Sequence, residues 1–544
     1  MAETNLSDVV VEYLIAKNVR YIFGVLAHTS FTLADAIAKR PELRFINTQH
    51  EGGAGNMALG YARTTKKPAV CLVSAGGGAT NIATAVAQAH KESVPLFVIS
   101  SEINTTSNAK GFFSSWHGME HTKLFQPITK QSIKLERPEE IGTVLDSLFS
   151  QTTRGRQGPV YLGLPADMQA AVLPEPVRFS GTGDLVAPSV DARSAESAMD
   201  LLLKASTPVV LCGTGVDWSG AQEEVRELAE LLDLPVAVSY TAKGVFPENH
   251  PLALGCLGVG GRPYARKFFL ESDLILALGT TFSEGTTLRF SQEAIPERAK
   301  IIQIDIDPQE LGRNYPTQLS IQADAKAALR AIIDGIKNKK PSAQAATGRR
   351  RAQEIQEAKQ AWLADRKQKV ASQGITKDSV LTTLNELLKG NETLIASGIT
   401  GEVVRNIDAS MPIIHAGEFR AIGTALATSL GVKLGLPDAR VVCVTGDGSF
   451  MMEQQELATA RLHNIPVLVL VLRNNAYGGM RRDQIKNHDG RIIGTELFVP
   501  DLARLAELFG GKGYSVTRVE EVRPILQQSL ESDDFVVVDI KLGQ

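Results

Sequence analysis

The sequence predicts an α/β protein that consists of three consecutive doubly wound parallel-sheet domains. Apolar runs of strand length alternate with helical patterns along the chain, which is typical of parallel strands covered by helices on both faces. The 544 residues exceed what one hydrophobic core normally serves, so two to four domains are expected. Apolar residues make up 43% and charged residues 22%, as in ordinary globular proteins.

The first domain is predicted over residues 1–180. Its apolar runs are short and bounded by polar or glycine-containing segments, which predicts strands joined by helices. The strands are expected at residues 21–25, 45–47, 69–73, 96–100 and 160–163. The loosely patterned segment 174–191 predicts a linker to the next domain.

The same alternation continues through the rest of the chain. The central domain is predicted over residues 192–340, with strands at residues 208–212, 236–238, 274–278 and 300–306. A helical linker is predicted over residues 341–375, because residues 347–373 are charged and follow a helical pattern. The third domain is predicted over residues 376–544, and its last strand is expected at residues 535–540.

Net charge and cysteine use argue against several classes of protein. The formal net charge of −3 argues against a nucleic-acid or membrane-surface role. No apolar run approaches the roughly 20 residues that span a bilayer, and the N-terminus lacks the features of a signal peptide. The four cysteines lack zinc-ligand spacing and are interpreted as reduced core residues of a cytoplasmic protein (Cys71, Cys212, Cys256 and Cys443).

A strand–turn–helix segment near the C-terminus carries the strongest chemical signal. The apolar run 441–445 leads into a Gly-Asp-Gly-Ser turn that contains Asp447, and a helical stretch is expected at 451–463. The next apolar run, 466–472, ends just before Asn474. Parallel strands of a right-handed βαβ unit end at the same edge of the sheet. Asp447 and Asn474 are therefore expected to lie close together, although 474 − 447 = 27 positions separate them.

Oxygen ligands at the start of a helix suit Mg²⁺, which prefers hard oxygen donors and usually completes its shell with a bound phosphate. The N–H groups of Gly448, Ser449 and Phe450 are expected to face the same phosphate. Gly-Asp-Gly alone also suits an ordinary tight turn. The strand before it and the asparagine pair after the next strand favour a metal–diphosphate anchor.

This segment resembles the diphosphate-binding motif of thiamine diphosphate (ThDP) enzymes. The three consecutive α/β units resemble the acetolactate synthase and 2-oxo acid decarboxylase superfamily over essentially the whole chain. The resemblance implies that residues 1–180 bind the pyrimidine and residues 376–544 the diphosphate of the cofactor. It implies ThDP and Mg²⁺ as cofactors, with Asp447, Asn474 and the carbonyl of Ala476 as metal ligands. Asn475 is the alternative to Asn474.

The resemblance also places further residues at the cofactor. Residues 74–81 resemble the family's Gly-rich loop, whose closing residue, Asn81, lies beside the cofactor; a plain turn is the alternative. Ile422 takes the place of the large apolar residue that bends ThDP, and it suits a core position equally well. Glu402 is unusual there, because phosphates repel a carboxylate unless a metal or a base offsets it. The implied cofactor-binding residues of the third domain are Thr400, Gly401, Ile422, Gly446, Gly448, Ser449, Ala476, Tyr477 and Gly478.

Glu51 is predicted to be the catalytic carboxylate. It follows a strand and opens a helix, so it is expected in a crevice at the carboxyl edge of the sheet. An acidic residue in this place can also simply stabilise the helix dipole. His50, Glu51 and the small residues after them resemble the family's catalytic helix. In that family the carboxylate shares a proton with the aminopyrimidine ring, and the carbon chemistry belongs to the cofactor.

Two histidines are predicted at the substrate. His28 follows the first strand, in a loop where the family usually has Pro-Gly at positions 26 and 27, and a histidine there can shuttle protons. This loop resembles, over a few residues, that of cyclohexane-1,2-dione hydrolase. His117 takes the position of a glutamine in acetolactate synthases. A structural histidine, an aromatic core and a surface arginine stay as alternatives for this pocket, whose other members are Phe112, Trp116, Met480, Arg481 and Gln484.

The central domain carries weaker signals. Residues 213–220 contain glycines in a pattern that can bind phosphate, and residues 304–308 resemble the family's strand end near a flavin or nucleotide. The flavin motif of acetolactate synthases is replaced by residues 279–285, so bound FAD is not favoured.

The expected function is a ThDP- and Mg²⁺-dependent lyase or carboligase that acts on a 2-oxo acid or 1,2-dicarbonyl compound, as acetolactate synthases do. A non-ligating decarboxylase and a cyclic dione hydrolase stay open, because the pocket departs from the family pattern at His28 and His117. A non-catalytic cofactor-binding subunit is the less favoured alternative, because such a protein would not need the carboxylate of Glu51. Since the family's site forms between the first domain of one subunit and the third domain of another, a homodimer or homotetramer is expected.

Overall fold

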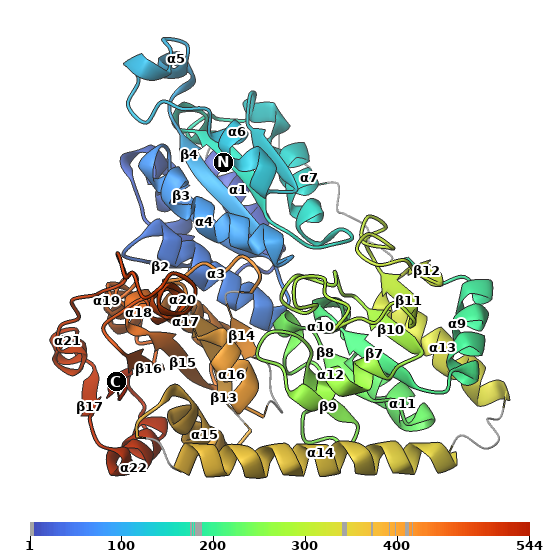
Figure 1. Cartoon of the computed structure of the whole chain (residues 1–544). Coiled ribbons are helices and arrows are strands. Elements are labelled where there is room, and N and C mark those ends of the chain that lie inside the picture. The colour runs from blue at the N-terminus through green and yellow to red at the C-terminus, as the bar shows by residue number, and fades with distance from the viewer. Residues whose placement is uncertain are drawn as a thin grey trace.

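Over the residues that it describes, the computed structural model contains three six-stranded sheets in which all strand pairings are parallel (Figure 1). Helices lie against the sheets, so the predicted α/β class with three doubly wound sheets is confirmed. The structure describes residues 5–173, 177, 179, 188–339, 345–371, 374–390, 392–397, 399–408, 413–415 and 417–543.

The first sheet has the strand order β2-β1-β3-β4-β6-β5. Its strands are β1 (Tyr21–Gly24), β2 (Arg44–Asn47), β3 (Ala69–Ser74), β4 (Leu96–Glu102), β5 (Gln131–Lys134) and β6 (Val160–Pro165). The predicted strands are present, but β5 is missed because its residues are only half-buried and form no apolar run. The helices of this unit are α1 (Leu6–Ala16), α2 (Phe31–Ala38), α3 (Glu51–Thr65), α4 (Gly77–Lys91), α5 (Thr105–Asn108), α6 (His121–Phe125), α7 (Ile141–Thr153) and α8 (Ala166–Gln169).

The central sheet has the order β12-β11-β10-β7-β8-β9, the arrangement of dinucleotide-binding folds. Its strands are β7 (Pro208–Cys212), β8 (Val236–Val238), β9 (Ala253–Cys256), β10 (Leu274–Leu278), β11 (Lys300–Asp305) and β12 (Leu319–Gln322). The sequence misses the two edge strands, since β12 is half-exposed and Gly255 in β9 has a φ of +74°. The helices are α9 (Ala192–Lys204), α10 (Thr214–Ser219), α11 (Gln222–Leu232), α12 (Pro263–Leu270) and α13 (Ala325–Lys339).

The third sheet, β14-β13-β15-β16-β18-β17, repeats the strand order of the first sheet. Its strands are β13 (Glu392–Ser397), β14 (Ile413–His415), β15 (Arg440–Gly446), β16 (Leu468–Arg473), β17 (Lys512–Val516) and β18 (Val536–Lys541). The helices are α15 (Lys377–Leu387), α16 (Thr400–Asn406), α17 (Ala425–Gly435), α18 (Asp447–Phe450), α19 (Glu456–His463), α20 (Gly478–Asn487), α21 (Leu502–Leu508) and α22 (Val519–Leu530). Short 3-10 helices elsewhere are η1 (His28–Ser30), η2 (Phe112–Ser114), η3 (Gln126–Ile128), η4 (Pro138–Glu140) and η5 (Tyr240–Ala242).

One predicted helix is wrong in its limits. Instead of one helix over residues 451–463, the chain forms α18 from Asp447 onward, then tight turns, and then α19 from Glu456. The turns are closed by backbone hydrogen bonds between residues three apart, such as Glu456 N–H to Glu453 O at 2.9 Å. The interruption directs the side chains of Glu453 and Glu456 toward two neighbouring helices.

The link between the central and third units is a single long helix. α14 (Ala345–Ala371) runs along one side of both units (Figure 1), in agreement with the helical segment predicted at residues 347–373. Residues 372–373, and most of the linker predicted at residues 174–191, lie outside the described part of the chain.

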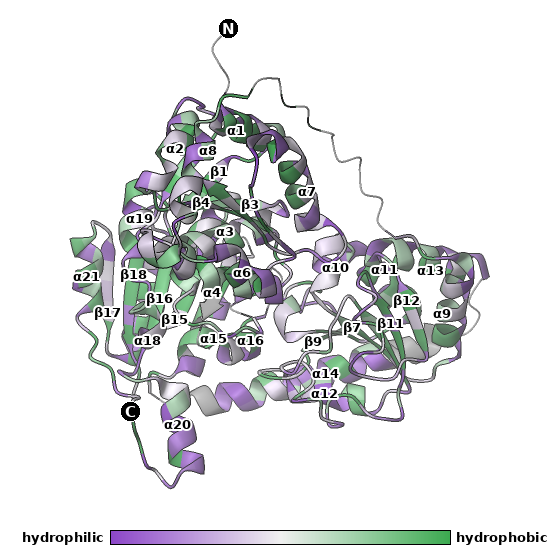
Figure 2. Cartoon of the chain, turned by 90° about the horizontal axis from the view of Figure 1, so that it is seen from above, coloured by the Kyte–Doolittle hydropathy of each residue, from purple (hydrophilic) through white to green (hydrophobic). Residues whose placement is uncertain are grey.

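The first and third units share one hydrophobic core, built around α3 and α17. Buried residues of both sheets, such as Val73 and Val469, belong to the same cluster as Ala58 of α3 and Leu430 of α17. The strands at the centre of each unit are mostly hydrophobic, whereas the outer helices carry hydrophilic stretches (Figure 2). The four cysteines are buried and unpaired, as predicted. Among the described helices, none is long and apolar enough to cross a membrane.

Glycines let α3 and α17 touch backbone to backbone. A Cβ at Gly60 would overlap the carbonyl of Thr428, and a Cβ at Gly431 would overlap the carbonyl of Met57. Gly60 of α3 faces the backbone of α17, and Gly431 of α17 faces the backbone of α3. These two close contacts restrict the position of one helix relative to the other.

Replacing Gly431 with alanine is expected to destabilise the protein by about 1–3 kcal/mol, because the added methyl group must push apart two packed helices. Gly374→Ala is the matched control, since nothing lies within 4 Å of a Cβ at that position. The unfolding free energies of both variants, measured in denaturant, check this. Equal stability of the two variants would contradict the close approach of α3 and α17.

Candidate active site

The strand order of the third sheet reverses between β13 and β15. In open parallel sheets, ligands bind beyond the carboxyl ends of the strands at such a point. β13 is followed by Thr400 and Gly401, and β15 runs into Asp447. The residues predicted to hold a diphosphate therefore lie where this type of sheet binds ligands.

Asp447 is buried at this edge, with only 2% of its surface exposed. Its Oδ2 accepts hydrogen bonds from the backbone N–H groups of Asn474 at 3.0 Å and Asn475 at 2.6 Å. The structure thus brings Asp447 and the asparagine pair together. The Gly448 N–H, expected to face a phosphate, instead donates to Asp447 Oδ1 at 2.9 Å, because that carboxylate oxygen is the acceptor beside it.

The two asparagines after β16 engage different partners. Asn474 Oδ1 accepts from the Ala476 N–H at 3.3 Å, and its Nδ2 lies so close to Gly478 that a Cβ there would overlap it. Asn475 has a left-handed backbone with φ +53°, and its Oδ1 accepts from Arg473 Nε at 2.8 Å. The amide oxygen of Asn475 is therefore held by a guanidinium on the other side of the turn.

Ile422 lies in a loop that is fixed to the Asp447 turn. The Gly423 N–H donates to Ser449 Oγ at 2.8 Å, and Gly423 adopts a φ of +73°. The side chain of Ile422 is 42% exposed, which does not suit a core residue. The structure therefore places Ile422 and Ser449 in one cluster.

Thr400 and Gly401 begin α16 and contact the central unit. A Cβ at Gly260, which has a φ of +75°, would lie 2.9 Å from the Cα of Gly401. The neighbouring Glu402 forms an ion pair with Lys377 Nζ at 3.4 Å. A base therefore offsets the negative charge that is unusual beside a phosphate site.

Glu51 is the first residue of α3, which follows β2 at the carboxyl edge of the first sheet. Its Oε2 accepts a hydrogen bond from Asn81 Nδ2 at 2.9 Å. A Cβ at Gly78 would lie 3.0 Å from its Oε1, so the glycine leaves room for the carboxylate. The predicted catalytic carboxylate, the Gly-rich loop and Asn81 are therefore one cluster.

A buried histidine supports the Gly-rich loop. The Gly76 N–H donates to His121 Nε2 at 2.7 Å, and His121 Nδ1 lies 2.8 Å from Glu102 Oε2. The hydroxyl of Tyr161 donates to the other oxygen of Glu102 at 2.8 Å. Because Nε2 accepts a hydrogen bond, the imidazole proton is assigned to Nδ1, where Glu102 accepts it.

The two clusters remain separate within one chain. Glu51 and Asn81 belong to the first sheet, whereas Asp447 and Asn474 belong to the third. No hydrogen bond in the described part of the chain joins Glu51 to Asp447.

Comparisons with known proteins agree on one family. Three family profiles match: "Thiamine pyrophosphate enzyme, N-terminal TPP binding domain" at residues 4–124, the "central domain" at 195–332 and the "C-terminal TPP binding domain" at 400–540. The chain is 31% identical to the probable acetolactate synthase large subunit of Methanocaldococcus jannaschii, over 98% of this chain and 91% of the relative. It is 31% identical to the acetolactate synthase large subunit of Buchnera aphidicola subsp. Schizaphis graminum and 30% identical to the acetolactate synthase isozyme 3 large subunit of Escherichia coli K12, in both cases over 98% of this chain and 94% of the relative.

The chain belongs to the thiamine pyrophosphate enzyme family. Thiamine pyrophosphate is another name for ThDP, so the predicted family and the predicted cofactor are both supported. The chain is accordingly a ThDP-dependent enzyme with the chemistry of a carboligase or lyase.

The predicted pocket residues of this ThDP enzyme lie at the surfaces of the first and third units, where they are exposed or half-buried. His28 is exposed, with its ring centroid 5.1 Å from that of Phe31. His117 is exposed as well, has a φ of +61° and lies beside Gly76. In the same loop as His117, Phe112 is half-buried and Trp116 is 90% exposed, so Trp116 is not a core residue.

On the third unit, α20 carries the remaining pocket residues. Met480 is 62% exposed, and Arg481 is half-buried. Gln484 donates through Nε2 to the carbonyl of Ile493 at 3.1 Å and accepts from its N–H at 3.0 Å. The amide of Gln484 therefore holds the following loop, which leaves Arg481 as the charged candidate for a substrate carboxylate.

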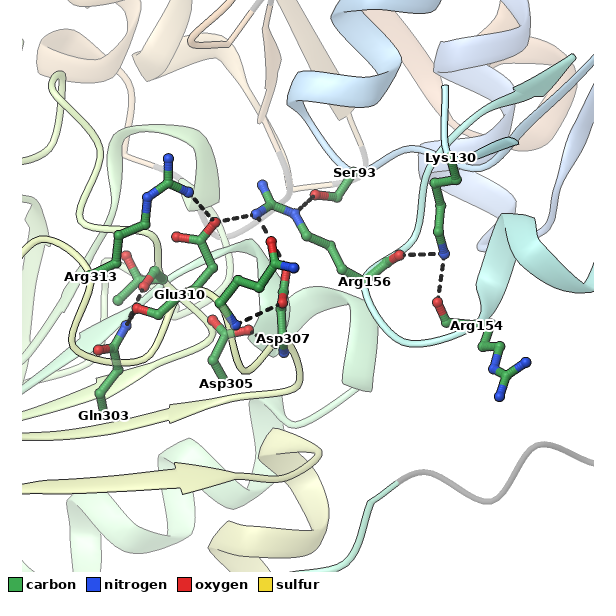
Figure 3. Close-up of polar contacts among 11 residues, drawn as sticks. Ser93, Lys130, Arg154, Arg156, Gln303, Asp305, Asp307, Glu310 and Arg313 are labelled. Atoms are coloured by element: carbon green, nitrogen blue, oxygen red, sulfur yellow. Dashed lines mark hydrogen bonds and ion pairs between the residues drawn. The ribbon is translucent and has the colours of Figure 1, made fainter. Parts of the chain in front are cut away.

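A cleft of about 600 Å³ lies between the first and central units, and Glu418 of the third unit also lines it, but no residue of the two clusters does. Arg156 crosses it and donates to Glu310 Oε1 at 2.6 Å and to Ser93 Oγ at 2.8 Å (Figure 3). Lys130 donates to the carbonyls of Arg154 and Arg156, and burial lowers its pKa to about 8. The side chains of Lys130, Arg156 and Arg313 in Figure 3 are thus already paired within the protein.

Two of the glycines predicted to bind phosphate in the central unit, Gly213 and Gly215, have a packing role. A Cβ at Gly213 or Gly215 would overlap or crowd the backbone of Gly279. At the end of β11, burial raises the pKa of Asp305 to about 6.

Sequence reasoning missed two buried acids of this enzyme, Glu453 and Glu456. They are 3% and 0% exposed. One helix was expected over residues 451–463, and nothing in the local sequence distinguishes these two glutamates from solvated ones.

Proposed function

We propose that the chain is an acetolactate synthase-like carboligase that joins two 2-oxo acid molecules with loss of carbon dioxide. The observation that carries this proposal is the combination of the buried Asp447 anchor with an oriented carboxylate at Glu51. Acetolactate synthase large subunits are similar to the chain over almost its whole length, which supports the same conclusion. We assign residues 1–180 to pyrimidine binding, residues 192–340 and 341–375 to the central domain and its helical linker, and residues 376–544 to diphosphate binding.

The residues present fit ThDP and Mg²⁺. We infer that Asp447, Asn474 and the Ala476 carbonyl hold the metal, because they offer hard oxygen ligands at the carboxyl edge of the sheet. Asn474 is favoured over Asn475, whose amide oxygen is paired with Arg473. A Cβ at Gly446 would meet nothing within 4 Å, so the backbone of this turn is open to a ligand. Further cofactor contacts are assigned to Asn81, Thr400, Gly401, Ile422, Gly448, Ser449, Tyr477 and Gly478.

ThDP, when bound, supplies a carbon nucleophile and an electron sink for the reacting carbonyl compound. Glu51 holds and returns a proton at the aminopyrimidine ring, and Asn81 orients its carboxylate. His28 and His117 are placed to move protons at the substrate, and Arg481 can bind its carboxylate through two parallel hydrogen bonds. Phe112, Trp116 and Met480 exclude water from the reacting atoms.

We infer that the site is completed by a second copy of the chain, as a homodimer or a homotetramer in the cytoplasm. The separation of the Glu51 and Asp447 clusters supports this inference. Large apolar side chains of both units are also exposed, as Phe113, Trp116, Met480 and Phe498 are. Such side chains are typical of surfaces that a partner covers.

A cyclic dione hydrolase or simple decarboxylase is the second candidate. The exposed His117 favours this second candidate. It lies beside Gly76 and takes the position of a glutamine in acetolactate synthases. A proton donor near the reacting carbon can protonate that carbon before a second carbonyl compound is ligated.

The test is ¹³C NMR of labelled pyruvate incubated with the protein, ThDP and Mg²⁺. Labelled acetolactate is the expected product. Labelled acetaldehyde as the product would mean that the enzyme decarboxylates pyruvate without ligation. No turnover of pyruvate would exclude both reactions and favour cyclic diketones as the substrates. We also expect the purified protein to be colourless, and a yellow protein with a flavin spectrum would contradict the inference that FAD is not bound.

A further inference from the structure

Two buried carboxyl groups lie between the first and third units and have no role in the function proposed above. Glu453 lies in the turns between α18 and α19, and Glu456, three positions later, is the first residue of α19. Each leaves its Oε1 without a hydrogen-bond partner in the described part of the chain, and Glu456 uses its Oε2 as an acceptor. Burying a carboxyl group costs free energy unless hydrogen bonds or opposite charges compensate for the lost hydration.

Glu456 contacts the start of α3. Its Oε2 accepts from the Gln49 N–H at 3.2 Å and from the Thr459 hydroxyl at 2.6 Å. Its Oε1 lies so close to Gly53 that a Cβ there would overlap it. The N-cap residue of α3, His50, accepts from the Gly52 N–H through its own side chain, and the Glu456 carboxyl satisfies the donor of Gln49 just before it, in the segment that leads into the turn carrying Glu51.

Glu453 does the same for α17. Its Oε2 accepts from the Ala427 N–H at 3.1 Å, and the N–H groups of Ala425 and Leu426 also stabilise its charged form. The N-cap residue, Thr424, makes no side-chain cap of its own. α17 follows directly on the loop that carries Ile422.

Burial opposes the charged form of both groups. It raises the pKa of Glu453 to about 8 and raises that of Glu456 as well, and the carboxyl of Glu456 also raises the pKa of Glu453. The backbone N–H groups act in the opposite direction. Each side chain therefore depends on the helix start that it contacts.

We propose that Glu456 is a positioning residue for Glu51 and that Glu453 is a positioning residue for Ile422. Glu456 acts through the first turn of α3, and Glu453 acts through the first turn of α17. The glycine contacts between α3 and α17 fix the two helices to each other, so the two carboxyls secure both helix starts from one turn of the third unit. This inference rests on the proposed function, because it assigns the two residues to the same active site.

The first test needs no cofactor. Amide hydrogen exchange of the full-length apoprotein, followed by mass spectrometry, is expected to be about 5–10-fold faster at residues 49–53 in Glu456→Ala, as for the loss of a helix cap. Glu456→Gln keeps an acceptor oxygen and should restore slow exchange. Glu520→Ala, an exposed glutamate of α22, is the control. Unchanged exchange at residues 49–53 in Glu456→Ala would overturn the proposal.

The second test separates positioning from general stability. At saturating ThDP and Mg²⁺, Glu456→Ala is expected to lower kcat about 10-fold, with ThDP affinity within about 3-fold of wild type. Glu453→Ala is expected to lower ThDP affinity instead, by about 10-fold. Equal effects of both variants on kcat and affinity would mean a merely structural role and overturn the proposal.

A milder variant covers the case in which Glu456→Ala fails to fold. Thr459→Val removes one hydrogen bond to Glu456 Oε2 and keeps the carboxyl. It should lower kcat in the same direction, and wild-type kcat in this variant would overturn the proposal. Glu51→Gln is measured alongside as a separate test of the proposed function. Full activity of Glu51→Gln would contradict the proposed role of Glu51. Faster exchange at residues 49–53 in Glu456→Ala would still support the contact of Glu456 with the start of α3.

Discussion

Glu51→Gln is expected to lower kcat by about 10²–10⁴-fold, the usual contribution of a positioned proton-transfer group. Glutamine has the same shape, and its amide oxygen can still accept the hydrogen bond from Asn81. An amide does not take up and return a proton near neutral pH, so only the proton transfer is lost. Steady-state turnover of pyruvate and calorimetric titration with ThDP check this, and the cofactor should bind with nearly unchanged affinity.

The matched control for this prediction is Glu12→Gln. Glu12 is an exposed carboxylate of α1 that pairs with Arg40 at the surface, and an exposed ion pair contributes little. Its kcat should equal that of the wild type. If Glu51→Gln kept more than about a tenth of the activity, Glu51 would be a helix-dipole residue, and another group would have to handle the proton.

The parts of the site that sequence could predict are those that lie on one strand and the turn after it. Asp447 and Glu51 follow strands whose apolar runs are plain in the sequence, and parallel sheets bring strand ends to one edge. The meeting of Asp447 with Asn474 follows from the βαβ connection alone. Local sequence therefore determined which residues lie at each edge.

Contacts between elements distant in the chain could not be predicted in this way. The contact of Glu456 with Gln49 spans more than 400 positions, and no local pattern encodes it. The support of Gly76 by His121 likewise depends on how α6 lies under the Gly-rich loop. Edge strands such as β5 and β12 were missed for a related reason, because a half-exposed strand lacks the apolar run that marks a buried one.

The helix prediction at residues 451–463 shows how one local error hides function. A continuous helix would place Glu453 and Glu456 on regular positions of one surface. In the structure the chain interrupts the helix, and the two carboxyls reach different helices. The break is favoured by tertiary hydrogen bonds that intrinsic helix propensity does not include.

Asp447→Ala is expected to abolish Mg²⁺-dependent binding of ThDP, with at least a 100-fold loss of affinity. Even outer partners of a metal site contribute about 10–100-fold to metal affinity, and Asp447 is the proposed charged ligand. At a ligand concentration of about 100 times Kd, binding stabilises a wild-type protein by about 2.7 kcal/mol. The rise in melting temperature on addition of ThDP and Mg²⁺ should therefore be present in the wild type and absent in Asp447→Ala.

Two comparisons make this result specific to the metal anchor. Asp483→Asn changes an exposed aspartate of α20 and should keep the full rise in melting temperature. Asp447→Ala also leaves the N–H groups of Gly448, Asn474 and Asn475 without their acceptor, so its melting temperature without ligand should be lower than that of the wild type. A variant that starts lower but still responds fully to ThDP and Mg²⁺ would mean that Asp447 only closes a turn. A variant that loses the response to Mg²⁺ identifies Asp447 as the group that holds the metal, because the turn donors bind no cation themselves.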